Sequence, residues 1–275
     1  MNINSLIKTD WDFAGEKTNS FTHSMHPYPA KYIPQIPRAI IQELSDRGDL
    51  VADIFCGSGT TLVEANLLGR NALGIDANPL ACLISEAKTI RLQVEDEAEL
   101  AKLIDKANKL AAQVSICSLP LISTIPYKSQ ASRPADDAIE FWFEPFVIEE
   151  LAEILSMCRQ LPTETSQKIA LVAFSSIVVS VSKQDSDTRY VRRDKKIKAG
   201  ETFRHFAYSL ARSVASVKEF TSIAPPNTTS KVYFTDILAA PDIEPMDLLV
   251  CSPPFSLDCL LAPVSIFPEI PPPAL

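Results

Sequence analysis

A glycine turn and a distant acid in the first third of the chain have the residue types and spacing needed to hold a nucleoside. Gly57 and Gly59 let the backbone turn sharply and let a ligand come close to its N–H groups. Asp76 follows Asp53 by 23 residues, and a carboxylate at the end of a second strand can accept both hydroxyls of a ribose. The alternative role for Asp76 is that of a turn residue or a helix N-cap.

The same turn argues against two other kinds of phosphate site. A dinucleotide-binding turn would place a third glycine at residue 62, which is Leu62 here. A Walker loop needs a Gly-Lys-Ser/Thr run, and none follows the turn. The sequence therefore indicates a nucleoside cofactor without a pyrophosphate.

A basic run in the second half of the chain has the charge needed to bind nucleic-acid phosphates. Residues 189–198 contain six positive side chains and one aspartate in a chain whose net charge is −8. We expect a loop that binds the phosphates of a nucleic acid; the alternative is an ordinary solvated loop. The candidate phosphate-binding residues are Arg189, Arg192, Arg193, Lys195, Lys196 and Lys198.

The elements that must position these residues alternate between strands and helices. The pattern predicts strands over residues 50–55, 71–75, 231–235 and 246–251, and helices over 32–44, 60–68, 95–114, 145–159, 166–182 and 201–220. A strand, a glycine turn, a helix and a second strand begin a parallel α/β sheet. We therefore expect an α/β fold in which 1–90 and 226–275 form the sheet domain and 91–225 is a mostly helical insertion between strands two and three.

Short motifs at four places in the chain together resemble a known family. Residues 53–61 (DIFCGSGTT) with Gly74-Ile75-Asp76 resemble motifs I and II of S-adenosylmethionine-dependent DNA amino-methyltransferases. Residues 26–31 (HPYPAK) resemble motif X, residues 234–236 (FTD) resemble motif III, and residues 252–255 (SPPF) resemble the catalytic motif IV. The resemblance covers about residues 20–90 and 228–255, and implies a Rossmann-like methyltransferase sheet.

The resemblance assigns a role to each matched position. It implies that S-adenosyl-L-methionine is held by His26, Lys31, Asp53, Phe55, Cys56, Gly57, Ser58, Gly59, Thr60, Thr61, Asp76 and Asp236. It implies catalysis by Ser252, Pro253, Pro254 and Phe255. An exocyclic base amine is a weak nucleophile, and acceptors aimed at its N–H bonds favour the pyramidal nitrogen that attacks a methyl group. Ser252 Oγ and the Pro253 carbonyl are the candidate acceptors, and Phe255 would stack on the extruded base. In isolation, the run is also compatible with an ordinary proline turn.

The segment after motif IV departs from the family pattern. Only 20 residues follow Phe255, rich in proline, where the family has several more strands. We expect a sheet that is incomplete after strand four, in a truncated chain or in one that a second polypeptide completes.

The predicted function is site-specific DNA methylation in a restriction-modification system, with cytosine N4 favoured by Ser252. The alternatives are an adenine-N6 DNA methyltransferase, an RNA amino-methyltransferase, and a catalytically impaired fragment that binds cofactor or DNA.

Composition excludes some other classes of protein and site. Six cysteines without a C-x-x-C pair, and three histidines, argue against a structural metal site. No apolar run approaches the roughly 20 residues needed to cross a bilayer, and residues 1–10 lack a signal pattern. We therefore expect a cytoplasmic protein without metal and without a membrane partner.

Overall fold

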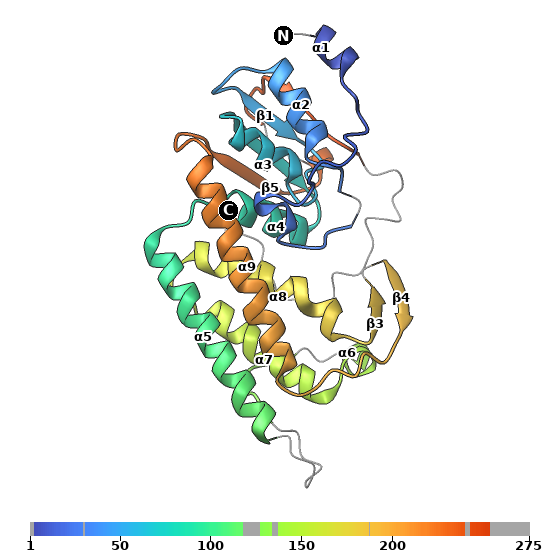
Figure 1. Ribbon diagram of the computed structural model, residues 1–275, viewed down its shortest axis with the longest axis vertical. Coiled ribbons are helices and arrows are strands. Elements are labelled where there is room, and N and C mark those ends of the chain that lie inside the picture. The colour runs from blue at the N-terminus through green and yellow to red at the C-terminus, as the bar shows by residue number, and fades with distance from the viewer. Residues whose placement is uncertain are drawn as a thin grey trace.

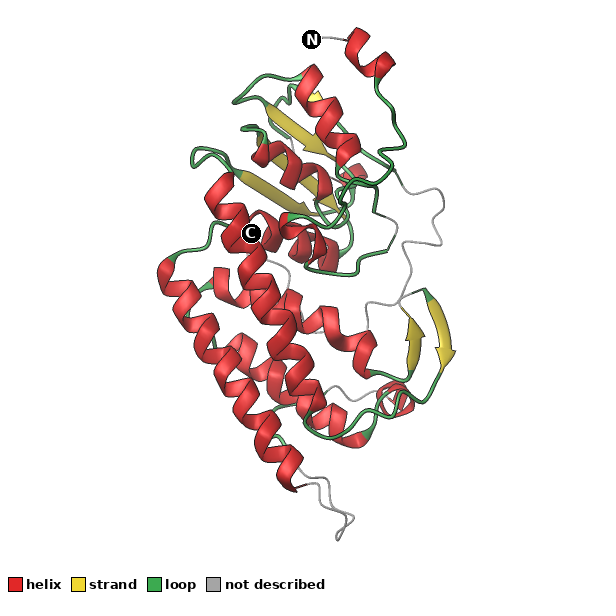
Figure 2. Cartoon of the chain, viewed as in Figure 1, coloured by secondary structure: helices red, strands yellow, loops and turns green. Residues whose placement is uncertain are grey.

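The computed structural model describes residues 3–29, 31–117, 127–133, 137–186, 188–239 and 243–253. Figure 1 shows a sheet region in the upper part of the view and a group of long helices beneath it. A two-stranded hairpin stands at one side of the helical part. Strands and helices are distributed as Figure 2 shows, with most of the helical residues in the lower part.

Four parallel strands form the sheet, in the order β5-β2-β1-β6. They are β1 (Leu50–Asp53), β2 (Asn71–Asp76), β5 (Ser230–Phe234) and β6 (Leu248–Leu249). Asp53 pairs with Gly74, and Asp76 pairs with Phe234, so the carboxyl ends of neighbouring strands meet at one edge. Open parallel sheets bind their ligands outside this edge.

Three helices pack against or near the sheet: α2 (Gln35–Leu44), α3 (Thr60–Leu67) and α4 (Pro79–Thr89). Ile41 of α2 and Leu62 of α3 are fully buried in one cluster with Val51 of β1, which fixes both helices against the sheet. Helix α4 instead contributes Ile84 to a second cluster, shared with the long helices. Because α4 also contacts β2 and β5, it joins the sheet region to the helical region.

The helical region lies between β2 and β5 in the chain. Its core consists of apolar side chains from α5, α7, α8 and α9, with Leu100, Ile154, Ile169 and Phe206 all fully buried. Its elements are α5 (Val94–Cys117), α6 (Asp137–Trp142), α7 (Pro145–Arg159), α8 (Glu164–Val181), β3 (Gln184–Ser186), β4 (Arg189–Arg192) and α9 (Glu201–Ile223). Three short elements lie outside it: α1 (Ile3–Lys8), η1 (Phe21–Ser24) and η2 (Ile237–Ala239).

The predicted α/β class with a parallel sheet is confirmed, and most element boundaries are close to the prediction. Two of them are wrong for identifiable reasons. The helix predicted from residue 32 begins at Gln35, after its N-cap Pro34, because a residue that precedes a proline is biased away from the helical conformation. Strand β1 ends at Asp53 rather than at residue 55, because the Asp53 carboxylate accepts the N–H of Phe55 and turns the chain.

Two further predictions need correction. Strand β6 is two residues long rather than six, pairing Val51 with Leu248 and Ala52 with Leu249. The basic run is not simply a loop, because residues 189–192 form β4 of an antiparallel hairpin. The division into a domain of residues 1–90 and 226–275 and an insertion of 91–225 stays a prediction. Among the described residues, no helix is both long and apolar enough to cross a membrane.

Candidate functional site

The glycine turn between β1 and α3 is held tightly against α4. Gly57 and Gly59 have φ values of 48° and 74°, in the left-handed region that glycine tolerates best. A Cβ on Gly59 would lie 2.9 Å from Ser85 Cα, so the absence of a side chain permits this close packing. Ser85 Oγ also donates to the Gly57 carbonyl over 2.8 Å. Helix α4 therefore determines the shape of the turn.

Asp53 stabilises the turn from inside the protein. Its carboxylate accepts the Thr61 hydroxyl over 2.6 Å and the Phe55 N–H over 3.1 Å, and the Tyr32 hydroxyl contacts Thr61. The side chain is 1% exposed, and burial raises the pKa of Asp53 to about 6. Asp53 is therefore placed to shape the turn and is not reached from solvent.

Asp76 ends β2 and lies against the same turn. Its two carboxylate oxygens accept the N–H groups of Gly57 and Asn78, each over 2.8 Å, and burial raises its pKa. Each oxygen keeps a second acceptor position, which is what two ribose hydroxyls would need. Asp76 also acts as a turn residue, which is part of the alternative role, because its carboxylate accepts the Asn78 N–H. The N-cap of α4 is Asn78, whose side chain accepts the N–H of Leu80.

Exposure divides the predicted turn residues into two groups. Phe55 and Gly57 are partly exposed, and both follow the carboxyl end of β1. The others are buried: Cys56, Ser58, Gly59, Thr60 and Thr61. A ligand at this edge can therefore touch Phe55 and the Gly57 backbone directly, whereas the buried residues shape the turn.

The structure brings two further predicted segments to this edge. Thr235, which follows β5, donates its N–H to the Asp76 carbonyl over 3.1 Å, and the exposed Asp236 comes next. Asp236 also accepts the N–H of Leu238 and so begins η2. After β6, Ser252 and Pro253 are exposed at the end of the strand beside β1. Pro254 and Phe255 lie outside the described residues.

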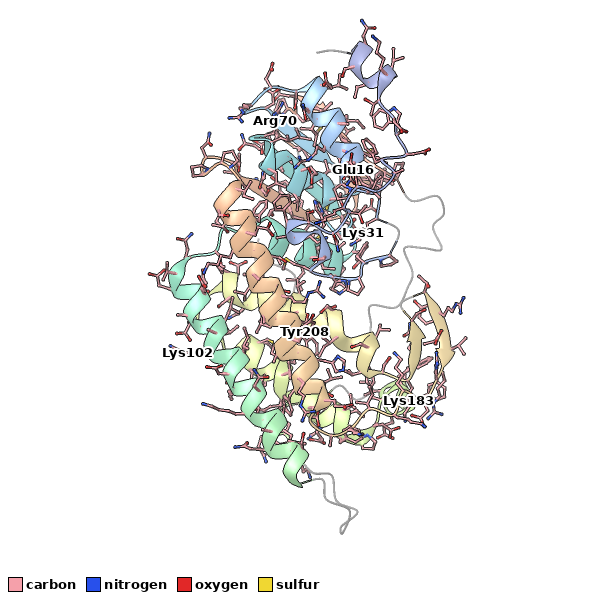
Figure 3. All side chains as sticks on the ribbon, in the orientation of Figure 1. Glu16, Lys31, Arg70, Lys102, Lys183 and Tyr208 are labelled. Atoms are coloured by element: carbon pink, nitrogen blue, oxygen red, sulfur yellow. The ribbon has the colours of Figure 1, made fainter. Side chains whose placement is uncertain are left out.

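The predicted motif X residues lie between the sheet region and the helices. His26 is buried, and its Nε2 atom is 3.1 Å from the Ser175 hydroxyl of α8. Burial, followed by the nearby Lys88 and Lys31 charges, lowers the pKa of His26 to about 3, so its ring is neutral. Lys31 is labelled in Figure 3 and donates to the His23 carbonyl over 2.9 Å. The contacts of these two side chains are therefore within the protein, with α8 and with His23.

Sequence reasoning missed Lys88, a fully buried residue of α4 beneath the turn. Its ammonium donates to the Ser58 carbonyl over 2.8 Å. Burial, with a smaller contribution from Lys31, lowers the pKa of Lys88 to about 7. The spacing of α4 gives no signal for this residue, because only the folded chain places α4 under residues 57–59.

The basic run is divided between exposed and structural positions. Arg189 and Arg193 have side chains that are 75% and 72% exposed, and both lie near Asp185 of β3. The Arg192 guanidinium lies 4.9 Å from the centre of the Phe141 ring. Lys195 instead donates to the Val179 carbonyl over 2.6 Å, whereas Lys196 and Lys198 are exposed. Lys195 is therefore partly committed to holding the segment against α8.

Comparisons with known proteins agree with the geometry of this edge. A family model described as DNA methylase matches residues 4–87, which include the turn, Asp76 and the predicted motif X. The matched part of the chain is thus similar to the DNA methylase family. The resemblance predicted from the motifs is thereby confirmed for the family.

The curated proteins that this chain resembles are mostly named as type II methyltransferases. M.MjaII of Methanocaldococcus jannaschii is 43% identical over 109 residues, which are 38% of this chain and 20% of the relative. M.MvaI of Kocuria varians is 31% identical over 173 residues, covering 62% of this chain and 36% of the relative. A ribosomal protein L11 methyltransferase of Vibrio cholerae is 28% identical over 136 residues, 43% of this chain and 46% of the relative. The chain thus spans less than half the length of each. No solved structure matches.

Proposed function

We propose that this protein transfers a methyl group from S-adenosyl-L-methionine to an exocyclic amine of a base in double-stranded DNA. The observation that carries the proposal is the pairing of Asp76 with the Gly57 N–H at the carboxyl edge of the sheet. This contact presents a carboxylate and a glycine backbone to the same space, which suits a nucleoside. The type II methyltransferase relatives support the choice of DNA as the substrate.

The residues present fit the proposed cofactor. Asp76 has free acceptor positions for the ribose hydroxyls, and Asp236 follows the neighbouring strand β5, where it would accept the adenine amino group. Gly57 lets a ligand approach, and the Phe55 side chain is partly exposed beside it. When bound, S-adenosyl-L-methionine supplies an electrophilic methyl group on a sulfonium.

Ser252 and Pro253 are the proposed acceptors for the reacting amine. Both follow β6 at the edge that also carries Asp76, and both are exposed to a substrate. The Ser252 hydroxyl and the Pro253 carbonyl would bind the two N–H bonds and hold the nitrogen lone pair toward the methyl group. Phe255 is proposed to stack on the base. No side chain needs to form a covalent bond with the base.

The finer assignments rest on the resemblance of the motifs. Cytosine N4 is favoured as the target because Ser252 begins the catalytic motif, and adenine N6 is the alternative. A restriction-modification role is proposed from the type II relatives. One relative is instead named as a methyltransferase of ribosomal protein L11. A second polypeptide that completes the sheet stays a prediction.

Two measurements on the same protein test the proposal. Isothermal titration with S-adenosylhomocysteine should give saturable binding, and tritiated S-adenosyl-L-methionine should label duplex DNA. Chromatography of the digested product then distinguishes N4-methylcytosine from N6-methyladenine. Ser252→Ala should leave the titration nearly unchanged and lower the rate of methyl transfer by about 10²-fold, as for the loss of one preorganised hydrogen bond. Absence of binding to the wild-type chain would refute the cofactor assignment, and label in RNA but not in DNA would refute the substrate.

A further inference from the structure

The β3–β4 hairpin carries a group of exposed aromatic and basic side chains that the folding of the helical region does not require. Tyr190 is 58% exposed and Val191 is 62% exposed, although both lie in a strand. Phe141, at the end of α6, is 50% exposed and lies under the Arg192 guanidinium. Exposed large side chains that are grouped together often mark a binding surface.

Tyr190 lies in an irregular stretch of the hairpin. Arg192 pairs with Gln184 near the base of the hairpin, and Arg189 pairs with Ser186 near its tip. The step from residue 189 to 192 faces the shorter step from residue 184 to 186, so β4 carries an extra residue here, as in a β-bulge. Bulges re-aim the side chains of their strand and are common beside functional sites.

The hairpin is anchored at its base. The Lys183 N–H donates to the Trp142 carbonyl over 2.7 Å, and the Lys183 ammonium lies 3.0 Å from a Glu144 carboxylate oxygen. Figure 3 labels Lys183 at the foot of the hairpin. In Figure 2 the two strands stand out on the right, the side toward which the strands of the sheet also run. A DNA duplex that reached the sheet edge from this side would meet the hairpin.

The charge of the hairpin favours a nucleic acid over an apolar partner. Asp185 is the carboxylate paired with both Arg189 and Arg193, so two exposed cations share one anion. Lys196 and Lys198 extend the positive charge beyond β4. Aromatic rings beside cations are the combination that binds bases by stacking and phosphates by charge.

We propose that this hairpin enters the DNA and that Tyr190 stacks on bases left unpaired when the target base is extruded. Arg189 and Arg193 would bind the flanking phosphates. The proposal rests on the proposed function, because base extrusion is needed only if the amine of a base in a duplex is the substrate. It assigns contact with unstacked bases to one residue, Tyr190, in addition to the binding of phosphates by the basic side chains.

The test compares a matched 30-base-pair duplex with the same duplex carrying a central bubble of two unpaired positions, both labelled with fluorescein. A bubble exposes base faces, so the recognition sequence need not be known. Wild-type protein should bind the bubble more tightly than the matched duplex. Tyr190→Ala should lower affinity for the bubble by about 5-fold to 100-fold, the range for the loss of one stacked base, and change the matched duplex little. Tyr190→Phe should keep the preference, because the ring is retained.

Two controls separate stacking from charge and from general loss of an exposed tyrosine. Tyr208→Ala removes a ring on α9 that is 67% exposed and lies 5.8 Å from the Arg212 guanidinium, and it should leave both affinities unchanged. Arg193→Gln should weaken both probes equally and reduce the slope of log affinity against log salt by about 1.

The outcomes distinguish failure of this inference from failure of the proposed function. A Tyr190→Ala protein that keeps the bubble preference, or that loses affinity equally for both probes, overturns the role of Tyr190. If the wild-type chain binds neither probe but still binds S-adenosylhomocysteine, DNA as the substrate and the hairpin as its contact both fail, whereas the cofactor assignment stands.

Discussion

The glycine turn and the β3–β4 hairpin are both candidate binding elements, yet they are built in opposite ways. In the turn, Gly59 is buried against Ser85, and Asp53 is satisfied by hydrogen bonds within the protein. In the hairpin, every residue of β4 is exposed, and the arginines have ion pairs only with the neighbouring Asp185 among the contacts described. A small ligand needs a site whose shape is fixed before binding, whereas a long, charged duplex can be bound by side chains that adjust.

The largest expected effect tests how rigid the turn is. Gly59→Ala should lower the free energy of unfolding by about 2–5 kcal/mol, combining the left-handed backbone cost with overpacking against Ser85. Gly15→Ala is a matched control, since Gly15 has a φ of 82° but nothing within 4 Å of a Cβ. It should cost only about 1–2 kcal/mol. Urea unfolding of both variants measures the difference, and equal losses would show that the turn tolerates a side chain.

The next effect concerns Asp76, the proposed acceptor for the ribose hydroxyls of the cofactor. Asp76→Ala should weaken binding of S-adenosylhomocysteine by about 10-fold to 100-fold, as expected when a hydrogen bond to a charged group is lost. Asp49→Ala is the control, because Asp49 also accepts a backbone N–H, from Asp46 over 2.7 Å, but precedes β1 at the opposite end of the sheet. Isothermal titration should show that the Asp49→Ala protein binds S-adenosylhomocysteine with unchanged affinity. Similar losses in the two variants would mean that Asp76 acts through general stability.

The turn was predictable because its signals are local. A buried strand, two glycines and an apolar helical face occupy residues 50–68, and the predicted strand at Asn71 also begins where β2 begins. Helix α7 follows its predicted bounds from Pro145 to Arg159, since proline favours a first helical position and the apolar spacing continues to the end. In these segments, neighbours in the sequence decide the structure.

The remaining features depend on residues far apart in the chain. Tyr32 reaches Thr61, and Lys88 reaches Ser58, across distances in sequence that no periodic pattern reports. The basic run carries the signal of a loop, and its pairing with Gln184 and Ser186 is what makes it a strand. The mutual positions of the strand ends could be predicted from the topology, whereas the supporting contacts beneath them could not.

Lys88 gives a pH-dependent test of the buried support under the turn. Its folded-state pKa of about 7 lies below the ordinary value of 10.5, so between these values the unfolded chain binds more protons than the native chain. The free energy of unfolding should therefore rise from about pH 7 to pH 9, by about 2 kcal/mol for this group. Lys88→Met should flatten that rise. Lys102→Met, at a side chain that is 72% exposed, should leave it unchanged. A rise that persists undiminished in Lys88→Met would assign it to other groups.

The smallest expected effect compares one residue type in the two regions. Arg70 is 7% exposed and donates to the Leu68 carbonyl over 2.6 Å and the Ser45 hydroxyl over 3.0 Å, so Arg70→Gln should destabilise the protein by about 1–3 kcal/mol. Arg193→Gln should change stability by less than about 0.5 kcal/mol, since its ion pair with Asp185 is solvated. Thermal and urea unfolding measure both. A large loss of unfolding free energy in Arg193→Gln would mean that this side chain stabilises the fold. Its role would then not be confined to binding DNA.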